Sequence, residues 1–429
     1  MIRELKTRTV IVGTGPGGAT IAKELAGRGE DVIIVEKGRD HQWPIGRTAA
    51  YVTMYDIKRS ADGVIVRRGI TTGGSTMLYS GNSYDPPAFM KEELGLDLAD
   101  EVAETKEELS IHPVPEFFFK DYVGTLRLVE AADALGYHMQ PQERFIDPKL
   151  CDPACDRCLF GCAVGAKWTS RSYLKDAVAS GAKLITRCDI KEVLVGEGAV
   201  EGVLAKTPSG PMRIHADRVI LAAGAIGTPV ILKRSGVTDA GSHFFTDPMS
   251  VMVGVMKDGP GTFHEITYTF ADLSDVGEFV IGNVGAVNAL AAQIIKRRYG
   301  ILLRSPQVKR MVGMFVKLCD EPTGSIDIKG KLHKKLSPAD EERMARGVAK
   351  AKAIMAKAGV IPETISVAKG IGGHPGGTAA VGRVIGNDLQ TEVKNLYVCD
   401  NSIMPYSGGI PPVLTLIALA KKTARTILA

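Results

Sequence analysis

The fold is decided by residues 9–36, TVIVGTGPGGATIAKELAGRGEDVIIVE. A short β-branched run is followed by a glycine-rich turn, an alanine-rich helical stretch and a second apolar run that ends in an acid. This order is typical of the first half of a Rossmann-type dinucleotide-binding domain. The opening of the chain therefore predicts an α/β protein that binds a dinucleotide, although a glycine-rich turn with nothing bound would have the same residues.

Each part of this motif has a physical role. Gly13 permits the tight turn, Gly15 lets backbone N–H groups approach a pyrophosphate, and Gly18 lets the helix pack against the strand. The helix N-terminus adds partial positive charge. Glu36 can accept hydrogen bonds from a ribose diol, and its charge disfavours NADP. The predicted cofactor-binding residues of this motif are Gly13, Gly15, Pro16, Gly17, Gly18, Glu36 and Lys37.

The composition sets the class of protein. The chain has 429 residues, 45% of them hydrophobic and 24% charged, which excludes a disordered or fibrous protein and allows about two to three lobes. A net charge of +5 over this length gives little support for nucleic-acid binding. The 48 glycines follow no fixed period, which indicates many tight turns and close approaches of backbone to a ligand.

Three later segments read as strands that return to the nucleotide-binding lobe. Residues 182–195 and 199–205 alternate like the strands of a hairpin, and residues 218–223 form a buried run that ends at Gly224. The glycine motif alone does not separate FAD from NAD. Late returning segments are found in two-lobed FAD oxidoreductases, so we expect FAD and a discontinuous first lobe.

Three blocks of sequence resemble the glucose-methanol-choline (GMC) family of FAD oxidoreductases. They are residues 224–237 (GAIGTPVILKRSGV), 374–378 (HPGGT) and 395–405 (NLYVCDNSIMP), and residues 337–359 fit the helix that precedes the last two. The resemblance implies a Rossmann-like FAD-binding domain and a smaller substrate domain on a mixed or antiparallel sheet. We expect the first from residues 1–85, 151–246 and 370–429, a partly helical connection over 86–150, and the second from 247–369.

The resemblance also implies further flavin contacts. The Gly-Gly-Ser-Thr core of the family's first signature is kept in residues 69–82, although Tyr79 stands where the family usually has asparagine. The last helix is expected to begin at Pro411 or Pro412, with its positive end toward the flavin. The implied contacts are Gly73, Gly74, Ser75, Thr76, Ile190, Val193, Ala223, Gly224, Asp400, Asn401, Pro411 and Pro412.

His374 is the expected catalytic base. Oxidation of an alcohol by a flavin needs a group that takes the hydroxyl proton, and a neutral imidazole is well suited to this. His374 lies in a glycine-rich loop within a family block, although a structural loop histidine would look similar. The family's second catalytic His or Asn is replaced within residues 407–412 (SGGIPP). Tyr406 and Ser407 are the polar side chains that could substitute for it.

Four cysteines cluster within twelve residues, at Cys151, Cys155, Cys158 and Cys162. Their gaps approach those of a ferredoxin run, with one extra residue in the first gap. We expect a [4Fe-4S] cluster on the nucleotide lobe; zinc and no metal remain open. The other three cysteines, Cys188, Cys319 and Cys399, are expected to be buried thiols.

A cluster beside FAD would change the electron acceptor. It would let a reduced flavin be emptied one electron at a time, which favours a dehydrogenase with a ferredoxin-like partner over a peroxide-forming oxidase. Two alternatives remain open at this point. One is a reductase of an unsaturated or carbonyl compound that receives electrons through the cluster, and the other is a non-catalytic FAD and Fe–S electron-transfer subunit.

Signals for export or membrane insertion are absent from the sequence. The chain enters a strand-like run at once, and its longest apolar stretches are about ten residues, about half of what spans a bilayer. We therefore expect a cytoplasmic protein. Residues 279–318 contain seven basic residues and no acid, which predicts either a surface for an acidic partner or anionic lipid, or a solvated face.

Overall fold

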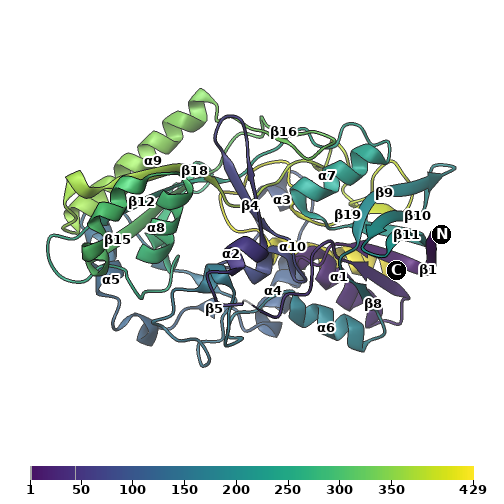
Figure 1. Ribbon diagram of the computed structural model, residues 1–429, viewed down its shortest axis with the longest axis horizontal. Helices are drawn as coiled ribbons and strands as arrows, with labels where there is room; N and C mark the ends of the chain where they lie inside the picture. Colours follow the sequence, from purple (N-terminus) through teal and green to yellow (C-terminus); the bar gives the residue numbers. More distant parts are fainter. Residues whose placement is uncertain (1, 44) are drawn as a thin grey trace.

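The computed structural model describes residues 2–43 and 45–429 and has two sheets at opposite ends of an elongated molecule (Figure 1). One sheet has seven strands and the other has eight. Their strands come from alternating parts of the chain, so neither sheet is built from one continuous segment. This mixed α/β architecture confirms the predicted fold class.

The seven-stranded sheet contains the nucleotide-binding motif. Its order is β8-β2-β1-β11-β10-β9, with β19 also paired to β11, and the four strands from β8 to β11 run parallel. The strands are β1 (Arg3–Val12), β2 (Val32–Val35), β8 (Lys183–Ile185), β9 (Asp189–Gly196), β10 (Ala199–Thr207), β11 (Gly210–Leu221) and β19 (Leu396–Val398). Parallel strands place their carboxyl ends at one edge, where dinucleotides bind.

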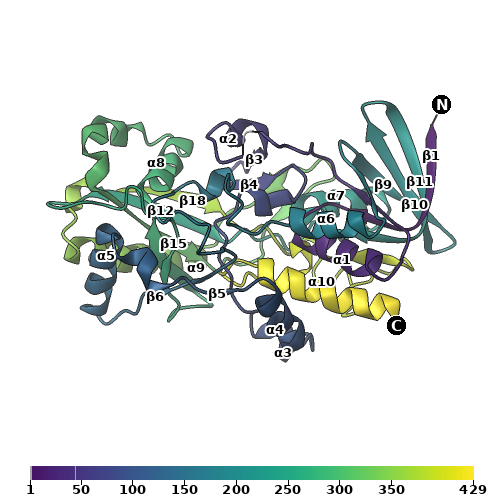
Figure 2. The same ribbon diagram turned by 90° about the horizontal axis from the view of Figure 1, so that it is seen from below.

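Helices cover both faces of this sheet. Ile11, Ile34 and Ile220 on one face share a core cluster with three helices, whereas Val10 and Val12 on the other share one with α7. Figure 2 shows α1 and α10 side by side beneath the strands. The helices are α1 (Pro16–Ala26), α6 (Arg171–Ala179), α7 (Gly224–Arg234) and α10 (Val413–Leu428).

The eight-stranded sheet forms the other end of the molecule. Its order is β3-β4-β18-β12-β15-β14-β13-β6, and only the β18–β4 pair is parallel. The strands are β3 (Tyr55–Arg59), β4 (Ile65–Gly69), β6 (Gln140–Pro141), β12 (Pro248–Val255), β13 (Phe270–Asp272), β14 (Phe279–Val284), β15 (Met311–Leu318) and β18 (Ser366–Gly372). Helices α5 (Val123–Asp133) and α9 (Pro338–Lys357) pack on one face and α8 (Ala286–Ile295) on the other.

Short elements connect the two sheets. The helical ones are α2 (Ala50–Thr53), α3 (Phe89–Glu92), α4 (Ala99–Glu108) and the 3-10 turns η1 (Gly74–Met77), η2 (Glu116–Phe119), η3 (Cys158–Phe160), η4 (Tyr299–Arg310), η5 (Pro362–Thr364) and η6 (Asn401–Ile403). The extended ones are β5 (His112–Pro113), β7 (Glu143–Arg144), β16 (Ser325–Ile326) and β17 (Leu332–His333).

Local predictions agree with these elements, with one difference. The expected helices over 337–359 and 411–428 are confirmed as α9, which Ser337 and Asp340 cap reciprocally, and α10. Residues 182–195 do not form one strand. Arg187 has a left-handed backbone (φ 56°) that divides the run, so β8 pairs with β2 at one edge and β9 with β10 at the other.

The expected domain boundaries stay a prediction. Strands β3 and β4 fall within residues 1–85 but pair in the eight-stranded sheet. The strands β14 and β15 that begin and end the basic stretch 279–318 are buried, and Lys317 is 4% exposed. That stretch is therefore not one continuous basic face. Across residues 2–43 and 45–429, no helix combines the length and apolar character needed to cross a bilayer.

Candidate active site

A cavity of about 480 Å³ is lined by residues of both sheets. The seven-stranded sheet contributes the glycine turn after β1, the end of β2 and the start of α7. The eight-stranded sheet contributes side chains from β3, β4, β12 and β15. The N-terminus of α10 and the loop after β18 complete the wall. The cavity therefore has a nucleotide side and a side formed by the second sheet.

The glycine motif leaves room for a pyrophosphate at α1. A Cβ on Gly17 would lie 2.0 Å from the carbonyl oxygen of Cys399, and one on Gly13 would lie 2.2 Å from that of Ala222. Gly15 meets nothing within 4 Å, because it borders the cavity. Gly15 is also the N-cap of α1 and makes no side-chain cap. The first amides of α1 are therefore available to an anion, and the residues present fit a dinucleotide.

Glu36 lines the cavity as expected but is already hydrogen-bonded. Its Oε2 accepts bonds from the backbone N–H (3.2 Å) and the hydroxyl (2.5 Å) of Thr14, and its Oε1 accepts one from Gly38 N–H (2.7 Å). Burial raises the pKa of Glu36, and these bonds oppose the rise. Because Oε1 accepts a single bond within the described residues, it can still accept one from a ribose hydroxyl.

Most other predicted flavin contacts line the same cavity. Those that do are Pro16, Lys37, Gly74, Ser75, Thr76, Ile190, Ala223, Gly224, Asp400, Asn401, Pro411 and Pro412. Three do not: Gly18 packs against the Gly13 carbonyl, Gly73 takes the left-handed turn before η1, and Val193 is a core residue. Asp400 accepts bonds from Gly224 N–H (2.8 Å) and the Thr228 hydroxyl (2.5 Å), so it holds the start of α7.

His374 lies in the loop that follows β18 and lines the cavity. Its Nδ1 is 3.1 Å from Asp247 Oδ2, and its backbone N–H donates to the Thr246 carbonyl (3.2 Å). A carboxylate can only accept at neutral pH, so Nδ1 carries the proton and Nε2 is the basic nitrogen. Asp247 therefore fixes both the orientation and the tautomer of the imidazole.

Asp247 binds two further side chains. The Lys317 ammonium lies 2.5 Å from Oδ2, and the Ser407 hydroxyl donates to Oδ1. The side chains of Asp247 and Lys317 are buried, at 2% and 5% exposure. Asp247 also has a left-handed backbone (φ 45°), a conformation that costs about 1 kcal/mol or more and often marks functional sites. Neither Asp247 nor Lys317 is among the site residues predicted from the sequence.

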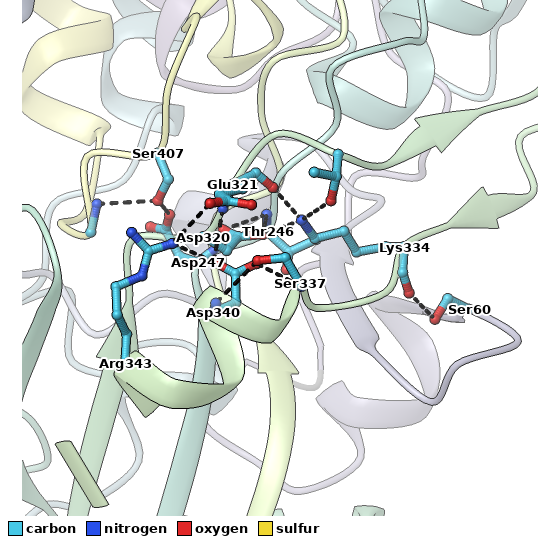
Figure 3. Close-up of polar contacts among 12 residues, drawn as sticks. Ser60, Thr246, Asp247, Asp320, Glu321, Lys334, Ser337, Asp340, Arg343 and Ser407 are labelled. Carbon is cyan, nitrogen blue, oxygen red and sulfur yellow. Dashed lines mark hydrogen bonds and ion pairs between the residues drawn. The ribbon is translucent and has the colours of Figure 1, made fainter. Parts of the chain in front are cut away.

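A second buried ion pair supports Asp247 from behind (Figure 3). Asp320 accepts hydrogen bonds from the backbone N–H of Asp247 (2.9 Å) and of Thr246 (3.1 Å). Lys334 binds Asp320 at 2.8 Å, and both side chains are fully buried. The same segment is tied to α9, because Glu321 N–H donates to Asp340 (3.1 Å). The backbone that carries Asp247 is therefore rigidly held.

The local charges set the protonation states. Burial, together with the Lys317 ammonium, lowers the pKa of His374, although Asp247 acts against this. Burial would raise the pKa of Asp247, but Lys317 and His374 outweigh it and lower that pKa below its usual value. His374 is thus neutral and Asp247 charged at neutral pH, which is the state a general base requires.

The two suggested substitutes for the missing catalytic partner are placed differently. Tyr406 is 45% exposed, packs edge-on against Phe89 at 5.5 Å and does not line the cavity. Ser407 also lies outside the cavity lining and contacts Asp247 instead. Lys317, the cation bound to Asp247, does line the cavity.

The four cysteines do not form a closed ligand set. In the part of the chain that the structure describes, no three His, Cys, Asp or Glu side chains converge as metal ligands. The metal site stays a prediction. Cys151 and Cys158 pack in the core cluster of the eight-stranded sheet with Phe118 and Met252, rather than on the nucleotide side as expected. Leu159, the next residue, lines the cavity.

Two family models described as GMC oxidoreductase match residues 17–254 and residues 315–420. The chain belongs to the GMC oxidoreductase family. The family match accounts for FAD as the dinucleotide and for oxidation at CH–OH groups as the type of reaction.

Similar proteins span nearly the whole chain. An uncharacterized protein of Methanocaldococcus jannaschii is 28% identical, covering 97% of this chain and 99% of that one. A long-chain-alcohol oxidase of Arabidopsis thaliana, FAO3, is 22% identical, covering 97% of this chain and 67% of the plant protein. Among solved structures, pyridoxine 4-oxidase from Mesorbium loti has a TM-score of 0.75 at 16% identity, covering 98% of this chain and 99% of the other. That structure shows the common fold.

Proposed function

We propose that this GMC oxidoreductase oxidises a hydroxyl group of a small molecule to a carbonyl with His374 as the base. The observation that carries the proposal is the Asp247–His374 contact in the wall of the cavity. It supplies a neutral, oriented imidazole at the point where the nucleotide side meets the second sheet. A structural loop histidine would need no buried carboxylate behind it.

The reaction breaks one O–H and one C–H bond of the substrate and forms a C=O bond. Bound FAD supplies the acceptor for the hydride and its electron pair. His374 Nε2 takes the hydroxyl proton, which makes the alkoxide a better hydride donor. Asp247 stabilises the resulting imidazolium, and Lys317 keeps Asp247 ionised through the cycle. The uncapped ends of α1 and α10 would hold the cofactor's anionic parts.

Anaerobic mixing of the FAD-loaded protein with a panel of alcohols tests this function. Bleaching of the oxidised flavin by at least one alcohol, at a rate that falls strongly in His374→Ala, is the expected result. The reductase alternative predicts instead that carbonyl or unsaturated compounds reoxidise the reduced flavin while alcohols do nothing. A non-catalytic electron-transfer subunit predicts that His374→Ala leaves the activity of the assembled complex with its partner intact.

We further propose that the four cysteines hold an anionic metal–thiolate centre, a [4Fe-4S] cluster before zinc. Two buried cations support this. Arg144 is 1% exposed, donates to the carbonyls of Thr267 and Ser80, and lies 3.8 Å from Cys158 Sγ. Lys167 is 4% exposed and donates to the carbonyls of Tyr79 (2.5 Å) and Cys158 (2.7 Å).

Neither cation has a carboxylate partner within residues 2–43 and 45–429. Burying an unpaired charge costs several kcal/mol, so an anion is expected nearby. Four thiolates around a divalent or [4Fe-4S]²⁺ centre carry two negative charges, which would balance Arg144 and Lys167. Electrons could then leave for a ferredoxin-like acceptor, since Leu159 joins the cysteine segment to the cavity wall.

Iron, sulfide and zinc analysis of anaerobically purified protein tests the centre. About four irons and four sulfides per chain are expected for a [4Fe-4S] cluster, and Cys158→Ser should lower both. Cys188→Ser, a buried cysteine outside the cluster, is the matched control. Protein free of all three elements that turns over with stoichiometric peroxide would overturn both the centre and the dehydrogenase assignment.

A further inference from the structure

Arg67 lies on the same sheet face as the substrate side of the cavity. In the eight-stranded sheet, Ile65 on β4 pairs with Ile371, Ile371 pairs with Met249, and Met249 pairs with Lys317. Directly paired residues share a face, and residues two apart on a strand share it as well. Arg67 therefore projects from the face that carries Met249 and Lys317.

The register also places Arg67 close to His374 along the sheet. Val66 pairs with Gly372 in the parallel β4–β18 pair. Arg67 is the next residue on one strand, and His374 is two residues beyond Gly372 on the other. Neighbouring strands lie about 4.8 Å apart. Both residues line the cavity, so the base and Arg67 leave adjacent strands at the same end.

The charge of Arg67 has no counterion. Its guanidinium makes one hydrogen bond, to the Tyr51 hydroxyl at 3.3 Å, and no ion pair with a carboxylate is found among the described residues. Arg68, one residue on, faces the opposite side and pairs with Asp56 at 2.8 Å. Both arginines line the cavity, but Arg68 is bound by Asp56 and Arg67 by no carboxylate, so Arg67 is the one of the two that is free to bind an anion.

The surroundings of Arg67 are not a phosphate cradle for the dinucleotide. The uncapped N-terminus of α1 lies at the glycine turn after β1, on the nucleotide side. Arg67 instead neighbours the phenol groups of Tyr51, Tyr55 and Tyr268, and the Tyr268 ring packs against Phe315 at 5.1 Å. Phe315 and Met249 give the same wall an apolar surface.

We propose that Arg67 binds a carboxylate or phosphate group of the substrate, so that the substrate is a hydroxy compound with an acidic group and an apolar body. This rests on the proposed oxidation of a hydroxyl by His374. The guanidinium can hold either oxyanion through two parallel hydrogen bonds. The apolar wall contacts the carbon chain, and the hydroxyl end reaches His374.

The test compares ω-hydroxyhexanoate, ω-hydroxyhexyl phosphate and hexanol as substrates of the FAD-loaded enzyme. The first two distinguish the carboxylate from the phosphate. We expect at least one acidic substrate to have a KM about tenfold or more below that of hexanol. Arg67→Met should raise the KM of the acidic substrate to about that of hexanol, and Arg67→Lys should keep part of the advantage. Arg59→Met, at an exposed arginine at the turn end of β3 in the same hairpin, is the matched control.

Binding without turnover separates this proposal from the proposed function. Calorimetry should detect binding of hexanoate or hexyl phosphate, which lack the hydroxyl. Arg67→Met should raise the Kd about tenfold or more. If they bind through Arg67 and no alcohol reduces the flavin, the oxidation fails and the anion subsite stands. Equal Kd values in wild type and Arg67→Met, or loss of FAD from Arg67→Met, would overturn the subsite.

Discussion

The buried and half-buried cations around the site fall into two groups, those with a carboxylate partner and those without one. Lys317 and Lys334 are each buried against a carboxylate, at 2.5 Å and 2.8 Å, and the carboxylates hold His374 and its backbone in place. Arg67 lines the cavity, and Lys167 contacts the cysteine segment at Cys158. Neither has a carboxylate partner among the residues described. The two lysine–carboxylate pairs therefore have no charge left to balance, and they hold the proposed base in position.

The unbalanced cations point to anions that the chain does not itself supply. Taking a charge out of water without a partner is costly, fully for the buried Lys167 and in part for the half-buried Arg67, so an anion is expected to bind at each. The comparison therefore separates residues that position a catalytic group from residues that receive a ligand.

The largest effect is expected at the base itself. His374→Ala should lower kcat by about 10²- to 10⁴-fold, because general-base catalysis contributes on that order. FAD content should stay the same, since His374 does not belong to the glycine motif. Steady-state kinetics with flavin absorbance measure both, and His138→Ala at an exposed site is the control. Full activity in His374→Ala would show that His374 is not the base.

The stability of two lysine variants should differ sharply. Lys317→Met leaves Asp247 buried without its counterion and should cost about 3 kcal/mol or more of unfolding free energy. Lys167→Met removes a charge that has no counterion, so in metal-free protein it should cost about 1 kcal/mol or less. Chemical denaturation of the metal-free protein measures both. Equal losses of unfolding free energy in the two variants would show that the carboxylate partner makes no difference to stability.

The pH dependence of the reaction should report the charge beside the base. The pKa of His374 is lowered by burial and by Lys317, so kcat/KM should rise with pH through a value below 6.5 and then level. Lys317→Met removes the positive neighbour and should move that rise to higher pH, because the imidazolium becomes easier to form. A pH–rate profile for each enzyme checks this. An unchanged profile would show that Lys317 does not lower the pKa of the base.

The smallest effect is expected at Ser407. Its hydroxyl donates one hydrogen bond to Asp247 and lies outside the cavity lining. Ser407→Ala should therefore lower kcat by about tenfold, because Asp247 keeps its contacts with Lys317 and His374 when the Ser407 hydrogen bond is lost. Steady-state kinetics measure it. A loss as large as that of His374→Ala would mean that Ser407 acts on the substrate.

The sequence allowed the nucleotide side to be predicted because its signals are local. The strand, glycine turn, helix and acid of residues 9–36 lie within one stretch of chain, and their spacing has direct geometric meaning. His374 could be predicted as the base because it lies in a compact family block. These parts of the site need few long-range contacts to be recognised.

Asp247, Lys317 and Arg67 could not be found in the same way. Asp247 and His374 are 127 residues apart and meet only through the pairing of β12 with β18. Lys317 was assigned to a basic surface stretch, whereas the pairing of β15 with β12 buries it against Asp247. Which charges are balanced depends on strand register, and local patterns do not encode that.

The alternation along β4 has a consequence for how this enzyme can evolve. Arg67 and Arg68 are consecutive and both line the cavity, but they leave opposite faces of the strand, and only Arg68 is bound to a carboxylate, that of Asp56. Insertion or deletion of a single residue in β4 would exchange their environments and destroy both at once. Point substitution at residue 67 leaves Arg68 in place. New substrate preferences should therefore arise in this lineage by replacement at that position, while changes of length are confined to the turn between β3 and β4.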